Sequence, residues 1–504
     1  MPGAWKFYGR QVELEELTGI VSRGRWFFVK ISGRRRIGKT TLVQQALART
    51  TGRPVLYIQV PDSDPAGVVS AAHAFMETFQ VPGDRPRSLQ ALAQNIGDLV
   101  RQGWVVALDE FQYFHRQSLW EFTSHLQAVV DGLAADAEGV TGGLIVLGSL
   151  HAEMAALLED RSAPLFNRVT HTFELGHLDI GSIVAMLEDH TDPAPERLLF
   201  LWNLFEGVPK FYRDCHEQGV LGHERREVLE RMFFSSSSPL RNEADNWFLK
   251  ELRGRYDLVL KYIAGHPGCT NADILGHARS VAPEDEHQVG GYLKILRERF
   301  QMIERLQPVF ARPTERNGRY YIRDNFLRSW LAAISHAAAA VNFRPLDVLV
   351  ADADSRLREA EGHGLERLVR QLYEERSRRR IGDFPLTAQV RGFWDRRDTE
   401  IDVVAIQEDT RTIRLGTCKR SGERLPSDLA RFDGHVGRFL AAFPDYRDWS
   451  VQKVAIAPAL DPETRRTIEG RGYLAQDLRD LTAGLGAGSP DTARLGPRAG
   501  ATGA

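Results

Sequence analysis

Short apolar runs alternate with helical patterns over the first third of the chain. Each run is about five residues long and ends at polar residues or glycine, which is typical of a buried strand. After the first run, Leu42, Val43 and Ala46 fall on one face of a helix. This alternation predicts an α/β fold with a parallel sheet over residues 1–180. The predicted strands are Phe27–Ile31, Val55–Val60, Trp104–Leu108, Leu144–Leu147 and Thr170–Leu175.

The pattern changes after residue 180. Residues 181–245 are predicted to be mostly helical, and 246–330 to hold three helices followed by a hairpin, the order of a winged helix. These elements are Asp257–Ala264, Asn271–Gly276, Val289–Phe300, and Met302–Leu306 paired with Arg319–Ile322. Further on, we expect a helical linker at 331–350, an α/β segment at 351–482 and a disordered tail at 483–504.

Composition places the chain among ordinary globular proteins and predicts several domains, because 504 residues are too many for one core. No apolar run approaches the roughly 20 residues that span a bilayer, and no signal-peptide pattern opens the chain. The cysteines, Cys215, Cys269 and Cys418, lack metal-ligand spacing. We therefore expect a cytoplasmic protein with no membrane contact. The formal net charge of -2 means that any nucleic-acid contact would use a local patch.

A phosphate-binding pattern, GxxxxGK(S/T), lies between the first predicted strand and its helix. The glycines let successive backbone N–H groups approach a polyphosphate, Lys39 would reach the β- and γ-oxygens, and Thr40 would ligate Mg²⁺. The three arginines could contact phosphate, an acidic partner or nucleic acid, or form a solvated loop tip. The residues expected to contact ATP are Gly33, Arg34, Arg35, Arg36, Ile37, Gly38, Lys39, Thr40 and Thr41.

Two acids follow the predicted strand Trp104–Leu108. Asp109 is expected to hold Mg²⁺ through water, and Glu110 to polarise the water that attacks the γ-phosphate. The alternative is an acidic turn after a core strand. The acids come about 70 residues after the phosphate-binding pattern, which favours a shared catalytic site.

Ser149 follows the predicted strand Leu144–Leu147. We expect it to sense the γ-phosphate, because neighbouring strand tips in a parallel sheet point at one crevice. His151 is the second choice, and a serine that caps the next helix is the alternative. Arg168 is a candidate arginine finger, in cis or in trans, and an ordinary surface arginine is the alternative. A finger in trans would require a homo-oligomer.

With these motifs in place, the chain resembles the archaeal-type ATPases of the AAA+/STAND-related branch of P-loop proteins. The resemblance covers residues 5–330 and rests on Phe7-Tyr8-Gly9-Arg10 with Glu13 and Leu17, on the phosphate-binding pattern, and on Leu108-Asp109-Glu110-Phe111-Gln112. Residues 206–212 are similar to the family's Gly-Gly-x-Pro lid segment, with Glu206 in place of the first glycine. The resemblance implies that Phe7, Tyr8 and Arg10 lie near the adenine and that Lys210 lies near the phosphates.

In that family, a domain resembling PD-(D/E)xK restriction endonucleases often follows the winged helix. Here Glu366 lies on a predicted helix, while Asp402 and Lys419 lie on successive predicted strands. Asp402 and a second acid would bind Mg²⁺, and Lys419 would steady the attacking water. Thr417 stands at the second-acid position, where a hydroxyl is a poor ligand. Glu366 or Glu400 could substitute, the domain could bind nucleic acid or protein without cutting, or Asp402 and Lys419 could merely pair.

The predicted recognition helix of the winged helix follows the acidic run Glu284-Asp285-Glu286. Such a run argues against entry into a DNA groove and favours packing between domains. Three hypotheses follow for the whole chain. The first is an ATPase switch that couples nucleotide state to the C-terminal domain. The others are an ATP-gated DNA-processing or defence nuclease, and a non-catalytic ATP-dependent scaffold.

Overall fold

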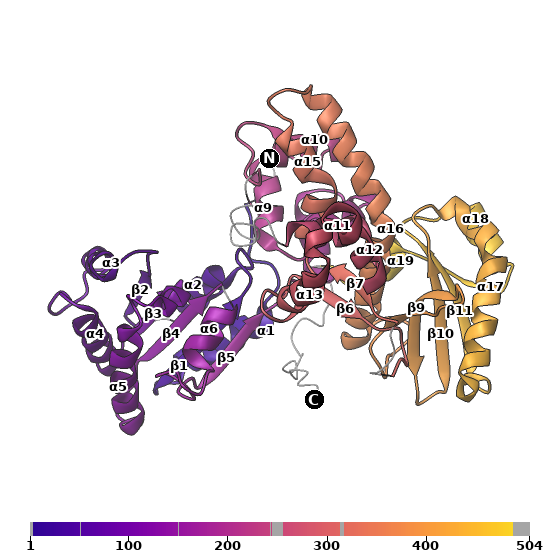
Figure 1. The fold of residues 1–504 in the computed structure, drawn as a ribbon. Coiled ribbons are helices and arrows are strands. Elements are labelled where there is room, and N and C mark those ends of the chain that lie inside the picture. The colour runs from indigo at the N-terminus through magenta and orange to yellow at the C-terminus, as the bar shows by residue number, and fades with distance from the viewer. Residues whose placement is uncertain are drawn as a thin grey trace. The chain divides into compact units, whose positions relative to one another are not determined.

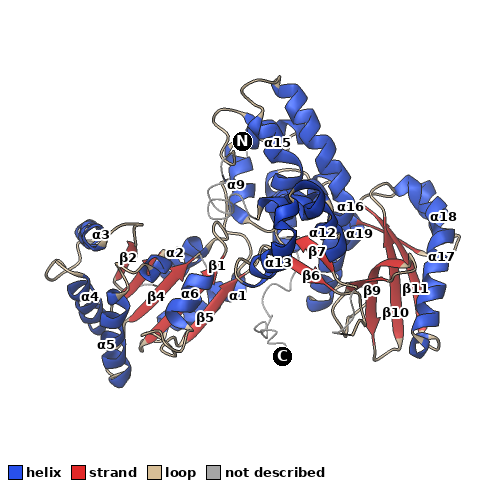
Figure 2. Cartoon of the chain, in the orientation of Figure 1, coloured by secondary structure: helices blue, strands red, loops and turns tan. Residues whose placement is uncertain are grey.

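The chain folds into two compact units. The computed structural model describes residues 4–50, 52–149, 151–241, 243, 256–312 and 317–486. The P-loop unit contains Gly9–Leu178 and Val208–Lys210. The C-terminal unit contains Met1–Tyr8, Asp179–Gly207 and Phe211–Asp491. Figures 1 and 2 show helices and strands in both units, as expected for an α/β protein.

A five-stranded parallel sheet forms the centre of the P-loop unit. All five predicted strands are confirmed, with ends that shift by at most two residues. Their bounds are β1 (Phe27–Gly33), β2 (Val55–Gln59), β3 (Val105–Asp109), β4 (Gly143–Gly148) and β5 (His171–Leu175). The strand order is β2-β3-β4-β1-β5. Since β4 lies between β1 and β3, its carboxyl end lies between the ends of those two strands.

Amphipathic helices connect these strands and bury their apolar stripes. They are α1 (Gln11–Ser22), α2 (Lys39–Arg49), α3 (Pro65–Thr78), α4 (Leu89–Arg101), α5 (Glu121–Ala135) and α6 (His151–Leu158), with a 3-10 helix, η1 (Phe111–His115), directly after β3. Asp64 caps α3 and Ser88 caps α4, each by accepting a backbone N–H of the first turn. Leu92 and Ile96 of α4 pack with Leu126 of α5 in one core with the sheet.

The C-terminal unit begins with helices that we call the lid helices. They are α7 (Ile180–His190), α8 (Pro195–Phe205), α9 (Pro209–Glu217) and α10 (Arg225–Leu229), followed by a π-helix, η2 (Glu230–Phe234). The next elements are α11 (Asp257–Gly265), α12 (Asn271–Val281), η4 (Pro283–Gln288), α13 (Val289–Glu298), β6 (Ile303–Leu306) and β7 (Arg319–Ile322). The hairpin β6–β7 is antiparallel. Three helices before a hairpin is the predicted element order for this segment.

One long helix, α16 (Leu346–Arg378), crosses the boundary expected between a linker and the last domain. The helical segments α14 (Asn325–Ser329), η5 (Trp330–Ile334) and α15 (Ser335–Ala339) precede it. Leu349, Leu357 and Leu368 are buried along α16, so one apolar stripe continues through residue 350. The helix therefore belongs to the linker and to the last domain at once.

The predicted α/β segment contains a second, mixed sheet. Its strands are β8 (Arg391–Trp394), β9 (Glu400–Gln407), β10 (Thr412–Cys418), β11 (Ser450–Ala457) and β12 (Leu474–Asp477), in the order β12-β11-β10-β9-β8. Strands β8, β9 and β10 pair antiparallel, while β10, β11 and β12 pair parallel. Its helices are α17 (Leu425–Ala442), α18 (Pro462–Glu469) and α19 (Leu478–Thr482).

Two sequence expectations concern the ends and the membrane. The tail expected at 483–504 lies outside the described residues beyond position 486. Within the described part of the chain, no helix combines the length and the apolar character needed to cross a bilayer.

Candidate functional site

Two glycines shape the loop between β1 and α2. Gly33 has φ +152°, and a Cβ there would lie 2.5 Å from the backbone oxygen of Leu175. Gly38 has φ +95° and stands at the N-cap of α2 without a side-chain cap. No acid occupies the first turn of α2. The backbone N–H groups at this helix start therefore have no side-chain cap from Gly38, which fits a phosphate-binding loop, and the phosphate contact stays a prediction.

Lys39 lies inside this loop with only 7% of its surface exposed. Its ammonium group donates to the backbone oxygens of Gly33 and Arg34, each at 3.0 Å. Burial lowers the pKa of Lys39 to about 8, although the nearby acids Glu110 and Asp109 oppose that shift. A bound polyphosphate would replace the two carbonyl partners with charged oxygens and favour the ammonium form.

Asp109 and Thr40 form the acid side of the site. The Thr40 hydroxyl donates to Asp109 Oδ2 at 2.7 Å, and the backbone N–H of Glu110 donates to Oδ1 at 2.8 Å. The Tyr57 hydroxyl, on β2, also donates to Asp109. A hydroxyl beside a buried carboxylate is a donor set that Mg²⁺ accepts in P-loop proteins, so these residues fit the expected metal.

Glu110 is held by a residue that the sequence argument did not assign a role. Gln112, only 2% exposed, donates to the Glu110 carboxylate and accepts the Ser149 backbone N–H at 3.2 Å. The Ser149 hydroxyl lies 3.4 Å from Glu110 Oε2. Because β4 separates β1 from β3, Ser149 lies between the loop and the two acids. His151 begins α6.

Sequence reasoning missed Tyr57 and Gln112 as site residues. Gln112 stands two positions after Glu110 in a short segment that already carried the family resemblance. Tyr57 lies opposite Ala107, two residues before Asp109, in the pairing of β2 with β3. The position of Gln112 in this segment was therefore a signal that the sequence alone contained. Tyr57 required the register of two strands that are about 50 residues apart along the chain.

Arg168 does not join this constellation within the chain. It makes a bidentate ion pair with Asp131 of α5, through Nε at 2.7 Å and Nη2 at 2.9 Å. Thr170, two residues later, pairs with Phe28 near the start of β1. Arg168 therefore lies at the amino edge of the sheet, roughly 16 Å along β1 from the loop. The expectation of a finger acting in cis on this site needs correction.

The N-terminal and lid residues fall into both units. Arg10 lies in the P-loop unit and donates to the backbone oxygen of Gly176. Phe7 and Tyr8 belong to the C-terminal unit, where the Tyr8 hydroxyl donates to Asp189 at 2.8 Å. Lys210 belongs to the P-loop unit, and the ring of its neighbour Pro209 would lie 3.7 Å from a Cβ at Gly38.

The arginine triplet of the loop does not act as one group. Arg34 lies 3.2 Å from the Nε2 atom of His177. Arg35 is exposed, and Arg36 has a left-handed backbone with φ 65°. Only Arg35 therefore projects fully toward solvent, and it lowers the pKa of Lys39 slightly through charge repulsion.

In the C-terminal unit, Glu366 of α16 and Asp402 of β9 face a common region. Burial raises the pKa of both carboxyl groups, and the neighbouring Glu366 raises that of Asp402 further. Arg370 opposes these shifts, since it lies 3.2 Å from Glu366 and donates to the backbone oxygen of Asp402 at 2.8 Å. A cation between two such acids would stabilise the charged form of both.

Thr417 lies on the next strand, β10, beside Asp402, and Lys419 follows directly after the end of that strand. The backbone N–H of Cys418 donates to Asp402 Oδ2 at 2.7 Å, and the Thr417 hydroxyl lies 3.3 Å from the same oxygen. Lys419 is partly exposed and lies 3.7 Å from Asp428. Glu366 and Asp402 therefore lie at the same end of the mixed sheet as Lys419, whose charge lowers the pKa of Glu366. A threonine stands in place of a second strand acid.

The hairpin β6–β7 and its loop pack on the mixed sheet. Arg319 of β7 pairs with Glu400 of β9 at 2.7 Å. The indole N–H of Trp394 donates to the backbone oxygen of Asn317 at 2.8 Å, and the Val309 N–H donates to Gly392. These contacts join the hairpin to the mixed sheet, and the packing role expected for the helix after the acidic run stays a prediction.

Comparison with known proteins finds a family match within the P-loop unit. Residues 27–152 match the family model of the AAA domain. Over 418 residues the chain is 23% identical to the uncharacterized protein MJECL04 of Methanocaldococcus jannaschii, and the match covers 80% of this chain and 85% of that protein. The AAA match contains the phosphate-binding loop, both acids and Ser149. The candidate site therefore lies within the segment that matches the AAA domain.

Two solved structures are similar to the chain at low identity. One is the Walker-type ATPase PABY2304 of Pyrococcus abyssi, with 19% identity, a TM-score of 0.48, and coverage of 64% of this chain and 96% of that chain. The other is the ORC2 protein of Aeropyrum pernix in ADPNP–ADP complexes, with 15% identity, a TM-score of 0.46, and coverage of 71% and 96%.

Proposed function

We propose that this protein is a Mg²⁺-dependent ATPase in which the nucleotide state of the P-loop unit controls the C-terminal unit. The observation that carries the proposal is the convergence of Lys39, the Thr40–Asp109 pair and Glu110 at the carboxyl edge of one parallel sheet. Each group supplies a different requirement of phosphoryl transfer, and the matched AAA domain supports the same chemistry.

The roles follow from the contacts. Lys39 and the N–H groups at the start of α2 bind the phosphates, and Thr40 with Asp109 would hold Mg²⁺. The metal neutralises charge on the phosphate oxygens when it is bound. Glu110 orients the attacking water and accepts its proton. Gln112 fixes the Glu110 carboxylate, and Ser149 lies on the side where the γ-phosphate would be sensed.

Phosphate release tests this proposal. In Glu110→Gln we expect nucleotide binding close to that of the wild type and hydrolysis slower by at least about a hundredfold, because the general base is lost. Asp136→Asn, at an acid after α5 outside the site, is the matched control. Hydrolysis by Glu110→Gln at the wild-type rate would exclude Glu110 as the base. Binding without turnover by the wild type would favour the scaffold.

A second candidate function is an ATP-gated nuclease. The juxtaposition of Glu366, Asp402 and Lys419 favours it, and the order of β8, β9, β10, α17 and β11 fits a nuclease-like core. Thr417 argues against efficient cutting, because it leaves one strand acid fewer for metal. DNA would bind at this end of the mixed sheet, since the β6–β7 hairpin is engaged within the chain.

Plasmid nicking with Mg²⁺ or Mn²⁺, with and without ATP, tests the second function. A nuclease would lose its activity in Asp402→Asn and keep it in Asp409→Asn, an exposed acid just after β9. If nicking survives Asp402→Asn, the activity does not come from this site.

A homo-oligomer that uses Arg168 in trans would have to open the ion pair between Arg168 and Asp131. Arg168→Gln would therefore lower ATP hydrolysis only in the oligomer.

A further inference from the structure

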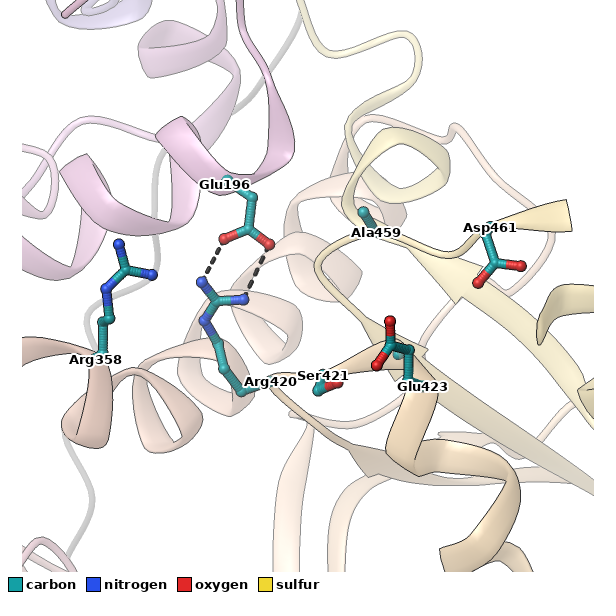
Figure 3. Close-up of a pocket in the computed structure, with 8 residues that line it drawn as sticks. Glu196, Arg358, Arg420, Ser421, Glu423, Ala459 and Asp461 are labelled. Atoms are coloured by element: carbon teal, nitrogen blue, oxygen red, sulfur yellow. Dashed lines mark hydrogen bonds and ion pairs between the residues drawn. The ribbon is translucent and has the colours of Figure 1, made fainter. Parts of the chain in front are cut away.

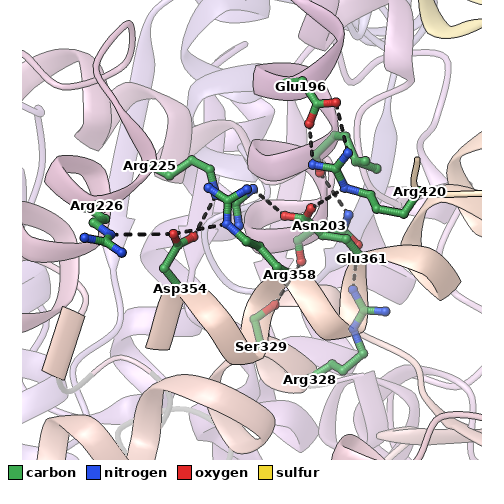
Figure 4. Close-up of polar contacts among 11 residues, drawn as sticks. Glu196, Asn203, Arg225, Arg226, Arg328, Ser329, Asp354, Arg358, Glu361 and Arg420 are labelled. Carbon is green, nitrogen blue, oxygen red and sulfur yellow. Dashed lines mark hydrogen bonds and ion pairs between the residues drawn. The ribbon is translucent and has the colours of Figure 1, made fainter. Parts of the chain in front are cut away.

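The lid helices and the mixed sheet share a buried ionic network along α16 (Figure 4). Glu361 of α16 is only 1% exposed. One of its carboxylate oxygens accepts from Arg225 of the lid helix α10. The other accepts from Nε of Arg420 at 2.8 Å, and Arg420 directly follows Lys419 at the end of β10. One buried acid therefore joins the lid to the strand end that carries the candidate nuclease lysine.

A second acid on the same helix strengthens the lid side. Asp354, two turns before Glu361 on α16, is 3% exposed and accepts from Nε of Arg225 at 2.7 Å. Arg225 also lies over the ring of Phe200 on α8, 4.2 Å from its centroid. The guanidinium is thus held by two acids and an aromatic face, so its position relative to α16 is fixed in three directions.

Arg420, at the end of β10, makes a further contact with the lid helices. The two Nη atoms of Arg420 donate to the carboxylate of Glu196, near the start of α8, in a bidentate pair. Figure 3 shows this pair at the wall of an open pocket of about 430 Å³ that Ser421, Gly422 and Asp461 also line. Solvent reaches Glu196, which is about half exposed, while Glu361 is closed to solvent.

A third junction fixes α7 to the same helix. The carboxylate of Glu375 accepts the backbone N–H groups of Ile180 at 2.7 Å and Gly181 at 3.0 Å, and thereby caps the start of α7. Arg379 pairs with both Glu375 and Asp179. Helix α16 therefore holds α7 and α10 through charged groups that are spread over about 20 residues of its length, while Arg420 joins α8 to the same network.

Removing one member of a buried ion pair leaves an uncompensated charge, so such pairs separate only at a large cost. Slippage between the lid and the sheet would break the pairs at Asp354, Glu361 and Glu375 together. We infer that Glu361 is the centre of a clamp that makes the lid helices and the mixed sheet one rigid body. Movement of the lid then carries the Lys419 end of the sheet with it. This inference rests on the proposed ATP switch for its trigger, but the clamp itself does not depend on ATP.

Spin-label distances test the clamp. Labels at Gln218→Cys, after α9, and Glu469→Cys, on α18, report the lid-to-sheet distance, since both positions are exposed. A label at Gln90→Cys on α4, paired with Gln218→Cys, reports movement between the two units. The native cysteines Cys215, Cys269 and Cys418 are buried. Each pair is measured in the full chain without nucleotide and with Mg²⁺ and a non-hydrolysable ATP analogue.

The clamp predicts a lid-to-sheet distance that is narrow and unchanged by nucleotide. In Glu361→Gln the distance distribution should broaden. The matched control Asp352→Asn, which alters an exposed ion pair on the same helix, should leave it narrow. Arg420→Gln should broaden the lid-to-sheet distance distribution as well, and it replaces Glu361→Gln in the test if that variant fails to fold.

Two outcomes would overturn the clamp. One is a lid-to-sheet distance that shifts with nucleotide in the wild type. The other is a distribution in folded Glu361→Gln and Arg420→Gln that is as narrow as in Asp352→Asn. Analogue binding is measured on the same samples by calorimetry. Absence of binding would contradict the proposed ATPase, while the comparison of variants without nucleotide would still decide the clamp.

Discussion

Lys39 is the residue at which burial and charge act most directly on the nucleotide site. Its pKa is lowered to about 8 by burial, against the attraction of Glu110 and Asp109. The convergence of Lys39, Thr40, Asp109 and Glu110 could be predicted from the sequence because each lies within a few residues of a strand end. Side chains at the ends of adjacent parallel strands converge whatever the rest of the fold does.

Proton uptake on nucleotide binding follows from this pKa. Around pH 8 part of the free protein carries neutral Lys39, and bound phosphate restores the ammonium, so binding takes up protons and weakens as the pH rises above about 8. Calorimetry in buffers of different ionisation enthalpy measures the uptake. The proton uptake should be smaller at a pH two units lower, because Lys39 is already charged there. Equal uptake at both pH values would contradict the prediction, and Arg101→Gln, at an exposed arginine of α4 outside the site, is the control.

Gln112 offers a prediction about orientation. Gln112→Ala removes the donor that holds the Glu110 carboxylate and the acceptor of the Ser149 N–H. We expect turnover to fall about 10–100-fold, as for other groups that orient a catalytic residue, while ATP affinity changes little. Steady-state phosphate release gives kcat, and nucleotide titration gives the affinity. A fall in affinity with unchanged turnover would assign Gln112 to binding instead.

For Arg168 the sequence already contained a signal against a finger that acts in cis, and a finger in trans stays a prediction. Arg168 precedes β5, and residues that precede a strand of a parallel sheet lie at the amino edge, away from the phosphate loop. Tyr57 was missed for a different reason. Its contact with Asp109 depends on the register between β2 and β3, which a single sequence does not specify.

At the scale of elements, the five strands of the P-loop unit were predicted because central parallel strands are continuous apolar runs. The continuous helix α16, which runs through the boundary expected at residue 350, was not predicted, because the alanine-rich stretch 332–340 resembles a linker. The structure instead carries one apolar stripe along α16, which only its packing partners on both sides reveal.

Gly33 provides an element-scale prediction. Gly33→Ala would place a Cβ 2.5 Å from the Leu175 backbone oxygen and force β1 away from β5. We expect the free energy of unfolding of the P-loop unit to fall by about 2 kcal/mol or more, and nucleotide binding to weaken. Denaturant unfolding measures the change. Gly19→Ala is the control, since a Cβ there meets nothing within 4 Å. Equal stability of the two variants would contradict the argument.

At the scale of the whole molecule, the five segments expected before the tail form two compact units. The lid, the three-helix segment with its hairpin and the mixed sheet belong together. Ion pairs such as Arg225–Asp354, which joins residues 129 positions apart, create this grouping. Local patterns do not encode such contacts, so a sequence reading divides the unit where its composition changes.

The two units predict two calorimetric unfolding transitions. ATP with Mg²⁺ should raise the midpoint of the P-loop transition, and a concentration 100 times the dissociation constant adds about 2.7 kcal/mol. The midpoint of the second transition should rise less, because the nucleotide binds to the P-loop unit. Gly33→Ala identifies the first transition by lowering its midpoint. A single transition, or equal shifts of both, would contradict two independent units.

Titration of the folded protein with ATP and Mg²⁺ in a calorimeter tests the central claim most directly. The account predicts saturable binding of one nucleotide per chain, lost in Lys39→Ala and kept in Lys453→Ala, where the lysine pairs with Asp433 on the mixed sheet. The absence of binding heat, or an unchanged affinity in Lys39→Ala, would contradict it.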